Sequence, residues 1–105
     1  MTYAAAMDAL GDPTRRAIFE RLKGGARAVG DLAGEFPVSR PAVSQHLQVL
    51  KRAGLVRDRR AGTRRLYELD PQGLEELRSY LETFWQTGLA DFKQAAEQHR
   101  KGSGS

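Results

Sequence analysis

The chain has 105 residues, a formal net charge of +4 and no cysteine. Its length fits one small domain, and the lack of cysteine excludes disulfides, thiolate metal sites and cysteine redox switches. No apolar run approaches the roughly 20 residues that cross a bilayer, and the first ten residues lack the pattern of a secretory signal, so we expect a cytoplasmic protein without membrane contact.

The first third of the chain predicts three short helices. Residues 3–10 form the first helix, and Asp12 begins the second, because aspartate caps free amides and a proline follows at the first helical position. Two glycines at 24–25 end the second helix. Residues 28–36 carry apolar side chains at helical spacing. We interpret them as the first helix of a helix-turn-helix, with its turn at residues 37–38.

Residues 39–53 predict the recognition helix of this motif. Ser39 caps it, and Val43, Leu47 and Leu50 form an apolar stripe. The opposite face is polar but not acidic, and its amides and hydroxyls are groups that bond base edges in the major groove of DNA. This face consists of Pro41, Ser44, Gln45, Gln48 and Arg52. His46 lies beside the stripe, and core packing and DNA contact remain equal alternatives for it.

The following segment predicts a β-hairpin. Residues 56–60 and 63–67 form two strands around a turn at Ala61 and Gly62. We favour a type I turn with Gly62 in the left-handed position, because alanine tolerates positive φ poorly and glycine adopts it without steric cost.

Positive charge is concentrated in the predicted recognition helix and the hairpin. Between Ser39 and Arg65 the chain holds eight of its 17 Lys and Arg residues and one acidic residue, Asp58. Such cations attract DNA phosphates, although charged residues also protect sheet edges from pairing. We expect Asp58 to lie opposite Arg64 or Arg65, to hold one arginine in place and to leave the others free for phosphates.

A last helix is predicted from Asp70 to about residue 97, and at about 1.5 Å per residue it is nearly 40 Å long. Its broad apolar face is too large for a small monomer to cover, so we expect a homodimer that meets through this helix and the first one. Within that interface we expect Leu81, Phe84 and Trp85 to be largely buried. The expected interface residues are Tyr3, Met7, Leu10, Leu77, Leu81, Phe84, Trp85, Leu89 and Phe92.

Three segments, LGDPTRRAIFERL, VSRPAVSQHLQVLKRAGLV and RRAGTRRLYEL, occur in this order with the predicted elements. The chain closely resembles the ArsR/SmtB family of bacterial transcriptional repressors over about residues 5–97. The resemblance implies a mainly α fold with a β-hairpin wing at residues 56–67, that is, a dimeric winged helix-turn-helix. It also implies that Arg40, Ser44, Gln45 and His46 are recognition residues.

Many members of this family sense metals through cysteines on the third helix or through paired Asp, His or Glu ligands on the last. This chain has no cysteine, and on the last helix Asp91 and His99 are eight residues apart with no second histidine after them. The chain resembles the metal-independent branch instead, because its last helix carries Phe84 and Trp85 and the segment 89–93. We therefore expect no metal and no cofactor, and we leave open whether a small-molecule effector exists.

Together these patterns predict a repressor that binds double-stranded DNA sequence-specifically as a homodimer on a near-palindromic operator. Residues 1–97 form the expected DNA-binding and dimerisation domain, and residues 98–105 form a flexible tail or cloning remnant. No catalytic constellation is visible, so we expect no enzyme. The alternatives are a protein-interaction module that docks an acidic partner and a cysteine-free metal sensor. The expected DNA-binding residues are Ser39, Arg40, Ser44, Gln45, His46, Gln48, Lys51, Arg57, Arg59, Arg60, Arg64 and Arg65.

Overall fold

The computed structural model describes residues 3–103, with the side chains described from residue 4 to residue 98. The chain divides into two compact units, of which the first ends at Glu75 and the second begins at Glu76. Within the described residues, no helix combines the length and apolar character that crossing a membrane requires.

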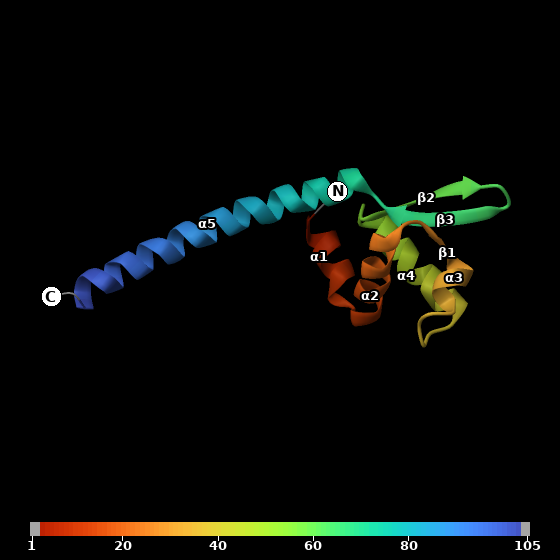
Figure 1. Ribbon diagram of the computed structural model, residues 1–105, viewed down its shortest axis with the longest axis horizontal. Helices are drawn as coiled ribbons and strands as arrows, with labels where there is room; N and C mark the ends of the chain where they lie inside the picture. Colours follow the sequence, from red (N-terminus) through yellow and green to blue (C-terminus); the bar gives the residue numbers. More distant parts are fainter. Residues whose placement is uncertain (1–2, 104–105) are drawn as a thin grey trace. The chain divides into compact units, whose positions relative to one another are not determined.

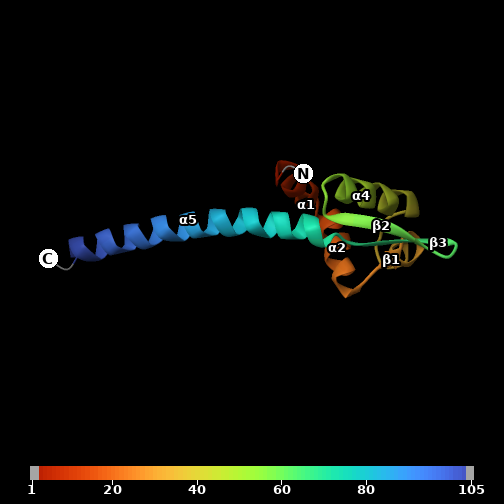
Figure 2. The same cartoon turned by 90° about the horizontal axis from the view of Figure 1, so that it is seen from above.

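The first unit contains short helices and a small sheet (Figure 1). In chain order its elements are α1 (Tyr3–Gly11), α2 (Pro13–Arg21), the 3-10 turn η1 (Leu22–Gly24), β1 (Arg27–Ala28), α3 (Val29–Ala33), α4 (Arg40–Arg52), β2 (Val56–Ala61), β3 (Arg64–Leu69) and the start of α5 (Pro71–Ser103). Helices α1 to α4 lie on one side of the β2–β3 hairpin in Figure 1, and α4 runs next to β2 in Figure 2. This order of elements is that of a winged helix-turn-helix, as the sequence predicts.

Two predicted caps begin α2 and α4. The carboxylate of Asp12 accepts a hydrogen bond from the backbone amide of Arg15 at 2.9 Å, and the hydroxyl of Ser39 accepts one from the amide of Ala42 at 3.2 Å. The bond from Arg15 lowers the pKa of Asp12 below its usual value of 3.8. Both caps bond one of the amides that a helix start leaves without a partner, so the sequence pattern places these helix starts correctly.

The core of the first unit is built around the apolar stripe of α4. Val43, Leu47 and Leu50 are fully buried, as predicted. The remaining fully buried large side chains come from α2, η1, α3 and the entry to the hairpin, namely Ile18, Leu22, Leu32, Leu55 and Val56. Since the stripe is buried, the opposite face of α4 remains available for other contacts.

The sheet is antiparallel and three-stranded, in the order β1-β3-β2. Strand β1, in which Arg27 pairs with Tyr67 and Ala28 with Leu66, is not predicted from the sequence. A two-residue strand has no periodicity of its own, and only β3 gives it partners. The predicted third helix over 28–36 was accordingly too long, because α3 spans only Val29–Ala33. The glycines at 30 and 34 also weaken helix formation there.

The hairpin turn lies one residue later than predicted. Ala61 pairs with Arg64, so the loop residues are Gly62 and Thr63. Gly62 has a φ of 65°, which confirms its predicted left-handed conformation. The expected type I turn is wrong, because a glycine at positive φ in the first position of a two-residue loop is the arrangement of a type II′ turn, whose twist matches that of the strands.

The first turn of α5 packs against the turn that follows α4. Gly54 adopts a φ of 82° after the end of α4. A Cβ atom built on Gly73 would overlap the carbonyl oxygen of Gly54. Both positions therefore require glycine, one for its backbone conformation and the other for close backbone approach.

In the second unit, α5 continues to Ser103, beyond the expected end near residue 97. Leu77 is buried, but Leu81, Phe84 and Trp85 are 41%, 67% and 63% exposed in the single chain. Leu89 and Phe92 are exposed too. The single chain thus does not bury this face, and its expected burial in a dimer remains a prediction. In the first unit Met7 is exposed and Leu10 half-buried, whereas the side chains of Tyr3 and His99 lie outside the described residues.

Candidate nucleic-acid interface

Outside its buried stripe, the surface of α4 is accessible. Arg40, Gln45 and Lys51 are exposed, and Ser44 and His46 are half-buried. Ser39, which begins the helix, is exposed as well. The structure therefore presents amide, hydroxyl and cationic groups on the accessible surface of a capped helix.

Gln48 is the exception among the predicted base-reading residues of α4. It is half-buried, and its amide nitrogen donates a hydrogen bond to the hydroxyl of Tyr67 at 3.2 Å. Tyr67 is buried at the base of β3. In this conformation Gln48 joins α4 to the hairpin.

All five arginines of the hairpin are exposed. The register of β2 and β3 separates their faces, because directly paired residues point to the same side of a sheet. One face carries Asp58 opposite Tyr67 and Arg60 opposite Arg65. The other carries Arg57 opposite Glu68 and Arg59 opposite Leu66.

Two expectations about Asp58 are wrong: it lies opposite Tyr67 in the sheet, not opposite Arg64 or Arg65, and the other hairpin arginines are not all free, because other acidic residues hold three of them. On one face of the hairpin, Nε of Arg59 lies 2.9 Å from Oε1 of Glu68, and Nε of Arg57 lies 3.7 Å from the same oxygen. Arg64 reaches Asp31 of α3, with 2.7 Å between Nη2 and Oδ2. Asp31 is distant from the hairpin in sequence, so no local pattern predicts its pairing with Arg64, whereas Glu68 belongs to the hairpin itself and lies directly opposite Arg57.

Asp58 holds one arginine, as expected, and in addition a lysine of α4. Its carboxylate pairs with Arg65, and its Oδ1 lies 2.7 Å from Nζ of Lys51 on α4. Hydrogen bonds from Lys51 and then from Arg65 hold the pKa of the Asp58 carboxyl below its usual value of 3.8. Asp58 therefore stays ionised at neutral pH. Within the described residues, Arg40, Arg52 and Arg60 have no ion-pair partner.

A hollow of about 280 Å³ separates the start of α3 from the hairpin. Three arginines and a hydroxyl border it, and its remaining wall is small and apolar. The lining residues are Ala28, Val29, Gly30, Arg40, Thr63, Arg64 and Arg65. Arginine presents several N–H donors in one plane, which suits the oxygens of a phosphate group.

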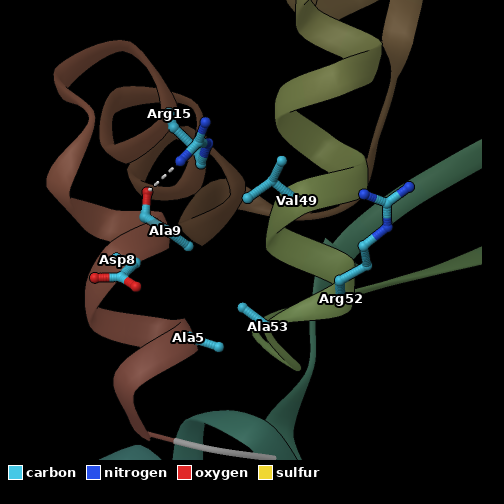
Figure 3. Close-up of a pocket in the computed structure, with 7 residues that line it drawn as sticks. All are labelled: Ala5, Asp8, Ala9, Arg15, Val49, Arg52 and Ala53. Carbon is cyan, nitrogen blue, oxygen red and sulfur yellow. Dashed lines mark hydrogen bonds between the residues drawn. The ribbon is translucent and has the colours of Figure 1, made fainter.

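A second hollow, of about 290 Å³, lies between α1 and α4 (Figure 3). Figure 3 shows the polar ends of Asp8 and Arg52 directed away from it, while Arg15 turns back to donate to the carbonyl oxygen of Ala9 at 3.3 Å. The Nε of Arg15 has no hydrogen-bond partner, but it is buried and does not open into the hollow. Because a ligand pocket needs convergent polar groups, the basic surface of α4 and the hairpin is the better candidate site.

No cluster of three His, Cys, Asp or Glu side chains suited to a metal ion occurs in the part of the chain that the structure describes.

Comparison with known proteins adds an independent line of support. Residues 10–59 match the family model of a helix-turn-helix domain. The chain is 62% identical over 89 residues to the HTH-type transcriptional regulator Rv2034 of Mycobacterium tuberculosis, covering 85% of this chain and 83% of the relative. It is 39% identical over 83 residues to the transcriptional repressor SdpR of Bacillus subtilis, covering 79% of this chain and 92% of the relative.

Solved structures give the same result. An ArsR-like transcriptional regulator from Rhodococcus sp. RHA1 matches with a TM-score of 0.74 and 33% identity, covering 90% of this chain and 92% of that chain. The homodimeric winged helix-turn-helix DNA-binding domain of a possible ArsR-family regulator from Mycobacterium bovis matches with a TM-score of 0.65 and 31% identity, covering 79% of this chain and 77% of that chain.

Proposed function

Because this chain belongs to the ArsR/SmtB family of winged helix-turn-helix transcriptional regulators, we propose that it is a repressor that binds a near-palindromic operator as a homodimer. Its chemistry is DNA binding and not catalysis, as in the regulators it matches. The SdpR relative is named a repressor, and the Mycobacterium bovis neighbour is a homodimer.

One observation carries the proposal. A capped helix with an exposed polar face lies beside a hairpin with five exposed arginines, and Asp58 ties the two together. The major groove of B-DNA admits an α-helix, and phosphates on either side of the groove attract cations. We propose that α4 enters the major groove while the hairpin follows the backbone or the adjacent minor groove. Two copies would place their α4 helices about 34 Å apart, one turn of DNA.

The accessible residues divide between two tasks in this proposal. Gln45 and Ser44 face the bases, because amide and hydroxyl groups read donor and acceptor patterns. The arginines of the hairpin and Arg40 face phosphates, which fix the orientation of the protein without reading sequence. Lys51 and Gln48 lie at the junction of α4 with the hairpin, so we assign them to positioning of the interface as well as to DNA contact.

Selection of bound duplexes from random DNA, followed by mobility-shift titration, tests the proposed function. The full-length protein should enrich a near-palindromic sequence and bind it with strong salt dependence. Polyglutamate at the same salt concentration distinguishes the alternative of an acidic protein partner. Polyglutamate that competes as well as the selected duplex, together with no enriched sequence, would show that the basic surface serves another partner.

Replacing Arg59, Arg60 and Arg64 with alanine should weaken binding to all duplex DNA and flatten its salt dependence. Each lost phosphate contact removes roughly 0.9 from the slope of log affinity against log salt. The measurement is fluorescence anisotropy with a random duplex over a series of salt concentrations. As the control, Lys23→Ala removes an exposed cation of η1, outside the proposed interface, and should leave the slope unchanged. An equal slope in the triple variant and the unmodified protein would rule out phosphate contacts from the hairpin.

Gln45→Ala should lower affinity for the selected operator by about 1–3 kcal/mol and change affinity for random DNA little. Gln45 is exposed on α4, so its truncation should not disturb the core. Gln72→Ala removes the same exposed side chain from the first turn of α5 and serves as the matched control. If the Gln45 variant loses operator and random affinity equally, Gln45 does not read bases.

A further inference from the structure

The carboxylate of Asp58 occupies the junction between the recognition helix and the wing. It pairs with Lys51 of α4 at 2.7 Å and also with Arg65 of β3. The side chain of Asp58 is 9% exposed, against 23% for Glu68 and 51% for Asp31, the other carboxylates that hold hairpin arginines. Asp58 is thus the most enclosed of these three acidic groups.

A second polar contact lies next to this one. Gln48 and Lys51 are three residues apart and share a face of α4, and Asp58 and Tyr67 are direct cross-strand partners. Gln48 donates to the hydroxyl of Tyr67 while Lys51 pairs with Asp58. Two adjacent residues of α4 are therefore bonded to two adjacent residues of the hairpin, which fixes the angle between the two DNA-facing elements.

The same carboxylate also lowers the charge that DNA meets. Lys51 and Arg65 remain 46% and 55% exposed while they are paired. Because Asp58 stays ionised at neutral pH, it competes with any phosphate for these two cations. A phosphate that approaches in the wrong geometry therefore gains less binding free energy from Lys51 and Arg65 than it would from two unpaired cations.

We propose that Asp58 is a positioning residue that sets DNA specificity, because it locks the wing to the recognition helix and restrains two cations that would otherwise bind any DNA. This inference rests on the proposed function, since it concerns how operator and random DNA are distinguished. Glu68 offers a matched comparison within the chain. It also holds two arginines, Arg57 and Arg59, but both lie in the hairpin and neither reaches α4.

The test compares Asp58→Asn with Glu68→Gln in the full-length protein. Two probes are used, namely the duplex selected by the unmodified protein and a scrambled duplex of the same composition. For Asp58→Asn, affinity for the scrambled duplex should rise and its salt slope should steepen by up to roughly 0.9 for each of the two released cations. The ratio of selected to scrambled affinity should fall about tenfold, as expected when the base-reading helix loses its fixed orientation.

Glu68→Gln removes the same charge and also releases two cations, but it leaves the bridge to α4 intact. Its salt slope should steepen for both duplexes, and its affinity ratio should stay within about twofold of the unmodified value. Equal affinity ratios for the two variants would overturn the proposal, because Asp58 would then act only as a negative charge. An unchanged ratio in Asp58→Asn would overturn it as well.

Lys51→Met removes the partner of Asp58 on α4 and keeps the test valid if Asp58→Asn fails to fold. It should lower the ratio of selected to scrambled affinity without steepening the salt slope. The double variant with Asp58→Asn and Lys51→Met should lower the ratio of selected to scrambled affinity no more than Asp58→Asn alone does. Substitutions at two residues that act through one contact do not have additive effects. Additive losses, or a Lys51→Met variant with an unchanged ratio, would contradict the bridge. If the unmodified protein itself fails to distinguish the two duplexes, the proposed function fails, and that outcome is separate from the variants.

Discussion

Phe84→Asp is expected to be a folded monomer that has lost operator binding. Phe84 is 67% exposed in the single chain, so a charge there should not disrupt the fold of one subunit. In a dimer that covers this face of α5, the same charge would be buried without a partner, which is strongly unfavourable. Loss of the second DNA-binding module should lower operator affinity by about 100-fold or more, because the linked copies bind as a bivalent ligand.

Sedimentation equilibrium and mobility shift with the selected operator measure these two effects. Gln86→Asp is the matched control, since it adds the same charge two residues away, about 200° around the helix from Phe84. It should remain dimeric and bind the operator normally. A Phe84→Asp variant that stays dimeric would show that the copies meet elsewhere. An unmodified protein that binds its operator as a monomer at micromolar concentration would contradict the homodimer itself.

Gly73→Ala should destabilise the protein by about 1–3 kcal/mol or more, the range for overpacked interiors. The added methyl group would overlap the carbonyl oxygen of Gly54, a backbone atom that side-chain rotation cannot move away. Gly54 itself is held at a φ of 82° in the turn between α4 and β2. Relief therefore requires the first turn of α5 to shift, together with the hydrogen bond from the amide of Gly73 to Asp70.

Urea denaturation at fixed protein concentration measures this loss, because the stability of a dimer depends on concentration. Gly11→Ala provides the control. Gly11 is also helical, and a Cβ atom there meets nothing within 4 Å. Its replacement should be neutral or slightly stabilising, since alanine favours helix over glycine. Equal unfolding midpoints for Gly73→Ala and the unmodified protein would show that α5 and the turn separate more easily than the structure indicates.

Local patterns in the sequence were sufficient for the elements that form the DNA-facing surface. Ser39 and the stripe of Val43, Leu47 and Leu50 predict both the start of α4 and the face that it buries, and the structure confirms both. Gly62 likewise predicts the tight hairpin turn, although the turn lies one residue later. These features are predictable because helix caps, helical periodicity and turn residues act within a few positions along the chain.

The apolar face of α5 was predictable from the sequence only in part. The sequence shows that this face needs a cover, and the single chain leaves Phe84 and Trp85 exposed. Periodicity determines which residues share a face, but the identity of the covering surface is a property of the assembly. The DNA contacts of the individual recognition residues likewise remain predictions, since they depend on a partner.

Only the tertiary structure decided how the hairpin is held. β1 forms because β3 offers two residues a pairing edge, and Asp31 meets Arg64 across a long stretch of chain. The sequence by itself determined that a capped helix and an arginine hairpin would form the basic surface. It did not determine that Asp58 would join them through Lys51. An ion pair forms wherever folding brings opposite charges within about 4 Å, and that distance is set by the packing of whole elements.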